Sequence, residues 1–474
     1  IMKKFSTKQK LIYSIIAFFS LIIVSFSTFT FVRGIHFSKI QNANIFSIQQ
    51  QNELELLLQN EYSHKNTILT KLPYNLAPVE LDVGAESAIL INTSNGNILY
   101  EKNADKIIPP ASMTKLFAMH VVMEEVRLGN LSYDDIIDLP PETWACNMPP
   151  HSSLMFLGKG HIVTLEELLL GMAISSGNDA AYAVAYKICG SMQEFVARMN
   201  EVAQQYGLKN THFVDSSGYS ELNSTTAREM ATFAQIYLQL HPEALEKFHK
   251  VPSFTYPKPH NMAPQDEYGA QDWSQGIPET ITMGITQKNT NPLLDKLKGC
   301  DGLKTGFINE SGYNLSLTVQ RDNTRFLSIT MGGKGNNTRE GNLGRIHDGT
   351  QMMEWAFSSF SDFYSPEFSK LHFIKSFGTK EKGINLVPAF KVESISVPYI
   401  TNGTLQENLS NVQVHIEKPS FIFGEVEQGQ IVGNIIVSLD GIQLEKIPLV
   451  CDRTTLKSNF VVRVADYILG KIFY

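Results

Sequence analysis

The spacing of apolar residues predicts a region of mixed helices and strands between about residues 79 and 365. In the stretch SAILINTSNGNILYEKN, apolar residues alternate on both sides of Asn95-Gly96, which is typical of a β-hairpin. A second strand pair is predicted around the turn Asp322-Asn323. Helical spacing predicts a helix from Ser112 to about Leu128 and a helical segment broken at SSGND. Further helices are predicted in MQEFVARMNEVAQQYGL, TTAREMATFAQIYLQLHP and TQMMEWAFSSF.

After about residue 370 the pattern changes to short alternating strands separated by Pro, Gly and Asp-Gly, which predicts a small β-sandwich domain over residues 370–458. Residues 459–474 predict a C-terminal amphipathic helix, in which Arg463, Asp466 and Gly470 fall on one stripe and nearly all other positions are apolar. Such a helix can lie in a membrane interface or pack on its own β domain. The pattern alone leaves both interpretations open.

The N-terminus carries the clearest targeting signal. Several lysines precede an uncharged, mostly apolar run from Leu11 to Val32, which Arg33 closes. The run is long enough to span a bilayer as a helix, so residues 1–34 are predicted to be a membrane anchor or a signal segment, and we favour the uncleaved anchor. Because the positive charges precede the span, the rest of the chain is expected at the outer face of the cytoplasmic membrane, in the cell envelope. Residues 35–78 are polar, and we expect them to form a spacer.

Composition excludes several classes of function. The net charge of −7 provides no basic field, so nucleic acid is not an expected partner. The 12 His include no H-E-x-x-H and no Cys/His ladder at metal spacing, so neither a catalytic metal nor another cofactor is expected. The 4 Cys are too widely spread for a disulfide framework, which favours free thiols.

Three short motifs occur in order within the mixed region: Ser112-x-x-Lys115, Ser176-Gly177-Asn178 and Lys304-Thr305-Gly306. Each motif alone is weak, and the first is also an ordinary helix start after two prolines. Their order, with intervals of tens of residues and then over a hundred, is far more specific. S-x-x-K, a second Ser/Asn element and K-T-G together are the signature of penicillin-binding proteins and serine β-lactamases.

A serine next to a lysine can perform nucleophilic catalysis. The Ser112 hydroxyl becomes a good nucleophile when a neighbour takes its proton, and residues three apart on a helix share one face, which places Lys115 over it. Lys115 accepts a proton only when neutral, so its pKa must fall from about 10.4 to roughly 7–8 through burial and nearby positive charge. Lys304 can supply that charge. Ser176 can bridge the two lysines and relay a proton to the leaving amine.

The remaining motif residues have the chemistry of a substrate-binding site. Asn178 can hold the amide of a substrate and orient Lys115. Lys304 and Thr305 can receive a substrate carboxylate. Two backbone N–H groups are also needed as an oxyanion hole.

At these motifs the sequence resembles the D-alanyl-D-alanine carboxypeptidases, the low-molecular-mass penicillin-binding proteins of serine-peptidase type. The resemblance runs from about Leu81 to the C-terminus and includes SSLMFLGKG, YGLKNTHFVDSSG, DGLKTGFINESGYNLSLTV and the C-terminal strands and tail. It implies an α/β (α+β) penicillin-recognising domain over residues 79–365, with an antiparallel sheet flanked by helices. It also implies removal of the terminal D-Ala from peptidoglycan stem pentapeptides through an acyl-enzyme, and covalent inhibition by β-lactam antibiotics.

The same resemblance implies roles for single residues. Ser112 would be the acylated nucleophile and Lys115 the general base, with Ser176 as the third catalytic residue. The N–H groups of Ser112 and Phe307 would form the oxyanion hole. In the stretch GRIHDGTQMMEWAF, Arg345 would help to hold the terminal carboxylate. The implied substrate-binding residues are Asn178, Lys304, Thr305, Gly306, Phe307 and Arg345.

Two features depart from the family pattern. Phe307 stands where a well-known branch has His, which puts a polar contact beside the carboxylate in doubt. An insertion near residues 258–283 precedes the K-T-G strand. A lid, a partner-binding site and a passive loop are the alternatives for it, and we favour the passive loop. The family attaches to membranes through its tail, so an N-terminal span in addition would tether this chain twice.

Two other functions remain as alternatives. A serine β-lactamase would need a Glu four residues before Asn223 for fast deacylation, and this chain has Tyr219 there. A non-catalytic cell-wall-binding protein could keep the same fold, but the presence of all three motifs argues against it.

Overall fold

The computed structural model describes residues 7–41, 52–54, 56–58, 69–72, 80–262, 284–398 and 409–473. The chain divides into two compact units. The larger unit comprises Asn66–Asp362 and Pro398–Asn402, and the smaller comprises Ile1–Lys65, Phe363–Val397 and Gly403–Tyr474. Most of the predicted spacer (35–78) and of the predicted insertion (258–283) lies outside the described residues.

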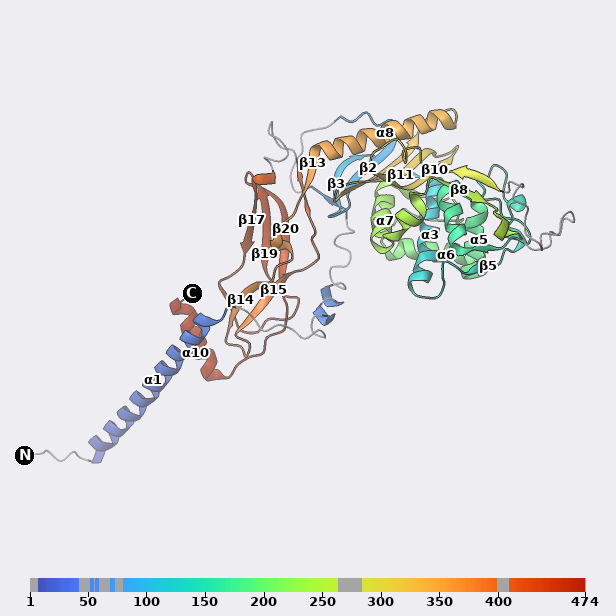
Figure 1. Cartoon of the computed structure of the whole chain (residues 1–474). Helices are drawn as coiled ribbons and strands as arrows, with labels where there is room; N and C mark the ends of the chain where they lie inside the picture. The colour runs from blue at the N-terminus through green and yellow to red at the C-terminus, as the bar shows by residue number, and fades with distance from the viewer. Residues whose placement is uncertain are drawn as a thin grey trace, which may run out of the picture. The chain divides into compact units, whose positions relative to one another are not determined.

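A six-stranded sheet forms the centre of the larger unit (Figure 1). Its strand order is β1-β3-β2-β12-β11-β10, and every pair is antiparallel except β1 with β3. Its strands are β1 (Thr70–Lys71), β2 (Ser87–Asn92), β3 (Asn97–Lys102), β10 (Cys300–Ile308), β11 (Gly312–Arg321) and β12 (Thr324–Gly333). Both strand pairs predicted from the alternation are therefore confirmed.

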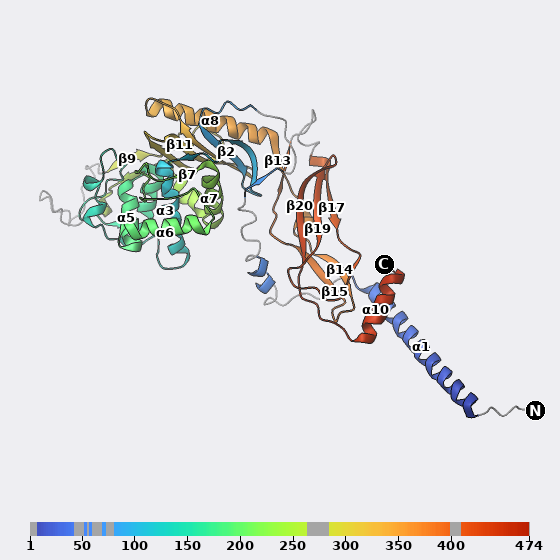
Figure 2. The same ribbon diagram turned by 180° about the vertical axis from the view of Figure 1, so that it is seen from behind.

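Apolar side chains cover both faces of this sheet, because successive residues of a strand point to opposite faces. On β2, Ile89 and Ile91 join one core, whereas Ala88 and Leu90 join the other. Helix α8 (Thr338–Ser359) contributes to the second core, and a group of helices contributes to the first (Figure 2). This group contains α3 (Lys115–Arg127), α4 (Leu165–Leu170), α5 (Asn178–Cys189), α6 (Met192–Gln205) and α7 (Ala227–Leu240). The expected antiparallel sheet flanked by helices is confirmed.

Shorter elements connect these layers. Helix α8 begins earlier than its apolar pattern predicts, at an Asn337 cap whose side chain accepts the Glu340 N–H. The short strands are β4 (Ile107–Ile108), β5 (Ile136–Ile137), β6 (Val163–Thr164), β7 (Thr225–Thr226), β8 (Ser253–Tyr256), β9 (Ile285–Lys288) and β13 (Phe360–Phe363). The short helical turns are η1 (Ala111–Thr114), η2 (Pro141–Thr143), η3 (Ala145–Asn147), η4 (Gly171–Ser175), η5 (Leu245–His249) and η6 (Pro259–Asn261).

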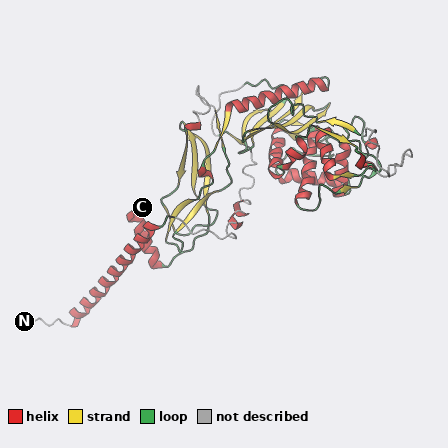
Figure 3. Cartoon of the chain, in the orientation of Figure 1, coloured by secondary structure: helices red, strands yellow, loops and turns green. Residues whose placement is uncertain are grey.

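The smaller unit contains the predicted C-terminal β domain (Figure 3). The β-sandwich expected over residues 370–458 stays a prediction, and six of the described strands there form one sheet with the order β17-β19-β20-β15-β14-β18. These strands are β14 (His372–Phe377), β15 (Gly383–Pro388), β17 (Val412–Glu417), β18 (Phe421–Phe423), β19 (Ile431–Leu439) and β20 (Ile442–Cys451). The same region also contains η7 (Pro366–Phe368) and β16 (Ile395–Pro398).

Helices from both ends of the chain belong to the smaller unit. Helix α1 (Thr7–Lys39) continues beyond the predicted boundary at residue 34. Among the described residues, it is the one helix that is long and apolar enough to cross a membrane, with a mean hydropathy of 2.3. Helix α10 (Phe460–Phe473) confirms the predicted terminal helix. Its Asp466 is fully buried, so the polar stripe does not simply face solvent.

Candidate active site

Ser112 stands in a tight turn that leads into a buried helix. It belongs to η1, and α3 begins three residues later at Lys115. Met113 and Phe117 are fully buried, whereas Ser112 keeps partial exposure. The apolar side of the helix start is therefore anchored in the core, and this anchoring leaves the Ser112 hydroxyl accessible.

Lys115 is completely buried and has a polar partner on each side of its amine. Its Nζ lies 2.8 Å from Asn178 Oδ1, 2.7 Å from the Ser217 carbonyl oxygen and 3.2 Å from Ser112 Oγ. A neutral amine has two N–H groups and one lone pair. The N–H groups can donate to the Asn178 and Ser217 oxygens, which directs the lone pair toward the Ser112 hydroxyl. This is the geometry that a general base for Ser112 requires.

Burial lowers the pKa of Lys115 to about 7, although the carboxylates of Asp215 and Asp179 act in the opposite direction. We expected the charge of Lys304 to cause part of this shift, but desolvation is the main cause. Burial also lowers the pKa of Lys304 well below its usual range, and the charges of Lys115 and Arg345 add to that effect. A substantial fraction of Lys115 is therefore neutral near pH 7.

Ser176 lies at the predicted break in the second helical segment. Helix α4 continues into the π-helical turn η4, and Ser176 then adopts a left-handed conformation with φ 59° before α5 begins. This conformation is strained for a residue other than glycine, and such strain is often found at functional sites. Ser176 Oγ accepts a hydrogen bond from Lys304 Nζ at 3.0 Å. Of the two contacts predicted for Ser176, the structure therefore shows the one with Lys304. The contact with Lys115 stays a prediction.

Asn178 begins α5 and connects two parts of the site. Its Oδ1 faces Lys115 Nζ, and its Nδ2 donates to Ser152 Oγ at 3.1 Å. Ser152 lies in the stretch SSLMFLGKG, which resembles the family but to which the sequence analysis assigned no role. Asn178 is therefore held between Lys115 and this stretch.

The third motif lies on β10, which runs beside the Ser112 turn. A Cβ on Gly306 would lie only 2.5 Å from the Pro110 carbonyl oxygen and 3.2 Å from Ala111 Cβ. Glycine is needed here because any side chain would push β10 away from η1. Thr305 Oγ1 donates to Thr290 Oγ1 at 2.8 Å.

Phe307 and Arg345 flank β10 differently. Phe307 is 45% exposed and its ring stacks on Tyr313, with 4.3 Å between the ring centroids. Arg345 extends from α8 and is buried, and its guanidinium donates to the carbonyl oxygens of Gly306 at 2.5 Å and Asn314 at 3.0 Å. It also donates to Asn342 Oδ1 at 2.8 Å. Arg345 therefore supports the K-T-G strand directly.

The sequence interpretation missed the loop that carries the Ser217 carbonyl. Asp215 Oδ1 accepts the N–H groups of Ser217 at 2.7 Å and Gly218 at 2.6 Å, which fixes this loop. Gly218 has φ +78°, and a Cβ on it would lie 1.8 Å from the Ala111 carbonyl oxygen. The signal available in the sequence was the stretch FVDSSG, in which Asp precedes a Ser-Ser-Gly turn.

Asp179 was also missed, although it follows Asn178 directly. It is fully buried, and its carboxylate accepts the N–H groups of Met155, Phe156 and Leu157 at 2.8, 2.8 and 2.9 Å. Burial raises the pKa of Asp179, whereas these hydrogen bonds act in the opposite direction. Asp179 therefore ties the SSLMFLGKG stretch to the start of α5.

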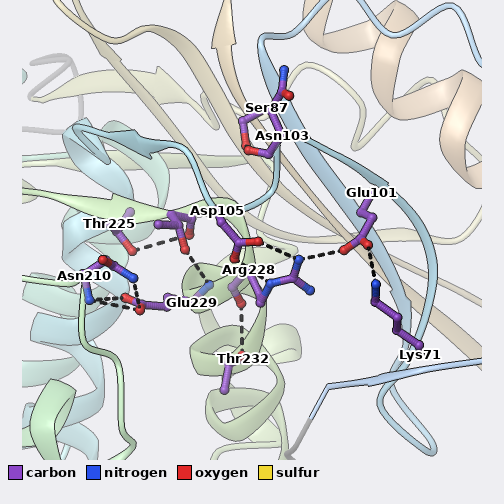
Figure 4. Close-up of polar contacts among 11 residues, drawn as sticks. Lys71, Ser87, Glu101, Asn103, Asp105, Asn210, Thr225, Arg228, Glu229 and Thr232 are labelled. Carbon is purple, nitrogen blue, oxygen red and sulfur yellow. Dashed lines mark hydrogen bonds and ion pairs between the residues drawn. The ribbon is translucent and has the colours of Figure 1, made fainter.

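A surface network holds the segment that leads to Ser112 (Figure 4). Strand β4 pairs with β7 through Ile107 and Thr226, directly before α7 begins. Arg228 on α7 donates to Asp105 at 2.6 Å and to Glu101 at 2.7 Å (Figure 4). The chain is thus fixed on the β3 side before it turns into η1.

A second polar cluster lies in the helical core, away from the motifs. His120 Nδ1 lies 2.9 Å from His241 Nε2, and the side chains of both can approach Glu124. Burial lowers the pKa of His120 to about 3, so this ring is neutral. The Glu124 carboxylate accepts hydrogen bonds from Nε and Nη2 of Arg127, at 2.9 and 2.6 Å. The sequence spacing did not reveal this cluster, whose polar atoms satisfy one another.

Comparison with known proteins identifies the family. Residues 74–335 match the profile of the D-alanyl-D-alanine carboxypeptidases. The chain belongs to this family. It is therefore a serine-type peptidase with the fold of its relatives, as the three motifs predicted.

Individual relatives extend the match beyond the catalytic unit. The D-alanyl-D-alanine carboxypeptidase DacF of Bacillus subtilis is 29% identical over 383 residues, which cover 81% of this chain and 88% of DacF. DacA of Escherichia coli is 28% identical over 400 residues, covering 81% of this chain and 87% of DacA. The crystal structure of penicillin binding protein 5 from Haemophilus influenzae superposes with a TM-score of 0.67 at 26% identity, covering 81% of this chain and all (100%) of that chain.

Proposed function

We propose that this carboxypeptidase removes the terminal D-Ala from peptidoglycan stem pentapeptides, with Ser112 as the acylated nucleophile and Lys115 as its general base. The observation that carries the assignment is the position of Lys115 Nζ, 3.2 Å from Ser112 Oγ and held from behind by Asn178 and Ser217. Neutral Lys115 takes the hydroxyl proton as Ser112 Oγ attacks the carbonyl carbon of the penultimate D-Ala. The N–H groups of Ser112 and Phe307 receive the negative charge of the tetrahedral intermediate.

Departure of the terminal D-Ala requires a proton on its amine. Lys115 holds the proton taken from Ser112, and we assign Ser176 to relay it to the amine. The contact of the Ser176 hydroxyl with Lys304 Nζ supports this assignment. Collapse of the tetrahedral intermediate then breaks the peptide bond, leaving an ester on Ser112 and free D-Ala. Water hydrolyses the ester in the second half of the reaction and regenerates the Ser112 hydroxyl.

The terminal carboxylate of the substrate is assigned to the K-T-G strand. Lys304 supplies an amine beside Ser176, Arg345 supplies a guanidinium next to the Gly306 carbonyl oxygen, and Thr305 supplies a hydroxyl. Gly306 keeps the strand close to Ser112, so a carboxylate bound here lies within reach of the nucleophile's turn. Asn178 is assigned to the substrate's amide.

Mass spectrometry of purified disaccharide-pentapeptide tests the reaction. The wild-type enzyme is expected to remove one Ala from each peptide, and Ser112→Ala, as the matched control, is expected to remove none. Loss of Ala at equal rates from both proteins would sink the assignment of Ser112. The absence of any loss by the wild type would exclude the carboxypeptidase reaction itself.

β-Lactams are the second class of compound assigned to this site, since the relatives include penicillin-binding proteins. A fluorescent penicillin is expected to label the wild type and not Ser112→Ala. Nitrocefin distinguishes the β-lactamase alternative. A long-lived acyl-enzyme supports the carboxypeptidase, whereas rapid sustained hydrolysis favours a β-lactamase. The non-catalytic alternative requires that neither reagent react.

We assign the catalytic unit to the outer face of the cytoplasmic membrane. Helix α1 is compatible with membrane anchoring, and the lysines precede its apolar run. A cysteine-reactive reagent that cannot cross membranes is expected to label the exposed Cys146 in intact spheroplasts. Labelling only after the membrane is permeabilised would place this unit in the cytoplasm instead.

A further inference from the structure

The two ends of the chain meet within the smaller unit. Helices α1 and α10 lie side by side where α1 ends (Figures 1 and 2). Arg33 forms a bidentate ion pair with Asp466, through its Nε and through its Nη2, which lies 2.8 Å from Asp466 Oδ2. The Gly378 N–H also donates to this carboxylate, at 2.7 Å. The pair therefore connects three segments of the unit.

Because this ion pair is buried, loss of either partner would destabilise the smaller unit. The Asp466 side chain is 0% exposed and the Arg33 side chain 14% exposed. A buried carboxylate is strongly destabilising when its cationic partner is removed, because one hydrogen bond does not compensate for the lost hydration. Without Arg33, Asp466 would keep the Gly378 N–H as its described partner. Asp466 on α10 thus requires a residue of α1.

Aromatic packing continues the same contact. Phe37 is 2% exposed, and its ring lies 4.4 Å from that of Phe377 on β14. Phe377 also packs against Phe421 on β18, with 5.1 Å between the ring centroids. These rings form one small core together with Leu469 of α10. The last turns of α1 therefore pack into the core of the β domain through Phe37.

Gly34 allows the close approach of α1 to α10, and Gly470 allows that of α10 to β18. A Cβ on Gly34 would lie 3.0 Å from Leu469 Cδ2, and a Cβ on Gly470 would lie 3.1 Å from Phe421 Cζ. His36 adds a polar contact, since its Nε2 lies 2.7 Å from Lys382 Nζ. The contact thus combines an ion pair, a hydrogen bond, aromatic rings and a glycine at the crossing.

The exposed surfaces of the two helices are apolar. The run Leu11–Val24 of α1 is largely exposed, as the membrane-spanning interpretation requires. On α10 the side chains of Phe460, Val461, Tyr467 and Ile472 are exposed, although the Tyr467 ring also contacts Phe423. Because Arg33 directly follows the apolar run, Asp466 and α10 lie at the depth where α1 leaves the membrane. An apolar helix face at that depth matches a bilayer interface.

We propose that α1 is retained in the mature protein as a structural part of the C-terminal β domain, and that α1 and α10 form one joint membrane anchor held by the Arg33–Asp466 pair. This inference goes beyond the carboxypeptidase reaction, because the contact lies entirely in the unit that lacks Ser112. Its partner is the lipid bilayer. Cleavage of α1 would leave Asp466 buried without Arg33 and would uncover Phe377.

Disulfide trapping in isolated membranes tests the contact in the full chain. The pair Gly34→Cys with Leu469→Cys is expected to cross-link on mild oxidation, because the two positions touch. Val32→Cys with Leu469→Cys is the matched control, since Val32 is 59% exposed. The cross-linked peptide is identified by mass after proteolysis, with the native cysteines in place. A cross-link at Gly34 at least fivefold above the control is expected. Equal yields, or none, would overturn the contact.

Charge variants then test the ion pair within the Gly34→Cys/Leu469→Cys protein. Arg33→Glu places a second anion beside Asp466 and is expected to reduce the cross-link at least fivefold. Arg33→Lys keeps the positive charge, and this variant is expected to retain most of the cross-link yield. Lys471→Glu alters an exposed charge on the same helix and is expected to have no effect. An unchanged yield in Arg33→Glu would remove the ion pair from the proposal.

Intact-mass measurement of the mature membrane protein tests retention separately. A mass that includes Thr7–Lys39 is expected, and a mature, folded protein without this segment would overturn the proposal. Penicillin labelling of Ser112 provides an independent readout. It is expected to be the same in every anchor variant, so failure of the anchor and failure of the catalytic assignment are distinguishable.

Discussion

Lys115 Nζ lies 2.7 Å from the backbone carbonyl oxygen of Ser217, a residue more than a hundred positions further along the chain. With Asn178 Oδ1 at 2.8 Å, this oxygen orients the amine toward Ser112. A backbone oxygen cannot be removed by mutating Ser217, so its role has to be tested through the residues that position it. These are Asp215 and Gly218.

Replacing Lys115 separates its role in catalysis from its cost in stability. Lys115→Met keeps much of the side-chain volume and removes the amine, so acylation by penicillin should fall at least a hundredfold. The folded protein should become more stable, because the pKa of Lys115 is lowered from 10.5 to about 7 by burial. The unfolded state therefore binds more protons between about pH 7 and pH 10, and stability rises with pH over this range.

Thermal unfolding checks this sign. The stability gain of Lys115→Met should be complete below pH 7 and shrink as the pH approaches 10. Lys209→Met, at an exposed position, is the control and should show no such pH dependence. A destabilised Lys115→Met protein at pH 6 would contradict the expectation.

The rate of acylation should rise with pH and level off above a midpoint near 7, because neutral Lys115 is the reactive form. Asp215 raises the pKa of Lys115 through its charge, so Asp215→Asn should move this midpoint to lower pH. The maximal rate should also fall, since the Asp215 carboxylate fixes the Ser217 loop. Glu221→Gln, on the exposed side of the same loop, should leave both quantities unchanged. A midpoint that moves to higher pH in Asp215→Asn would contradict the assigned base.

Gly218 and Gly207 provide a matched pair for testing the approach of the loop to the Ser112 turn. Both have positive φ, +78° and +70°, but a Cβ on Gly218 would lie 1.8 Å from the Ala111 oxygen, whereas Gly207 has open space. Gly207→Ala should cost about 1–2 kcal/mol of stability and leave acylation unchanged. Gly218→Ala should cost more stability and slow penicillin labelling at least tenfold. Equal labelling rates in the two variants would argue against the close approach.

Arg345 is expected to have two separable effects. Arg345→Ala removes the donors to the Gly306 and Asn314 oxygens and should loosen β10 for every substrate. It should lower kcat/KM further for peptides with a free terminal carboxylate than for amidated analogues. Comparing the two substrates in wild type and Arg345→Ala measures the difference. If kcat/KM falls equally for both substrates, Arg345 only supports strand β10 and does not bind the terminal carboxylate.

The sequence determined the types of the reacting residues and much of the local structure. The alternation around Asn95-Gly96 specified a hairpin, and the helical spacing after Ser112 specified α3, because both depend on neighbours in the chain. The order of the three motifs was sufficient to predict the family. The sequence also marked α1 and α10 as apolar helices.

Only the tertiary structure decided how distant segments meet. It brought the Ser217 carbonyl to Lys115, pressed Gly306 and Gly218 against the Ser112 turn, and paired Arg33 with Asp466 across the length of the chain. No local period encodes such contacts, since they depend on packing between elements far apart in sequence. Burial is likewise a property of the whole fold, so the lowered pKa of Lys115 emerges only when the surrounding helices and strands exclude water.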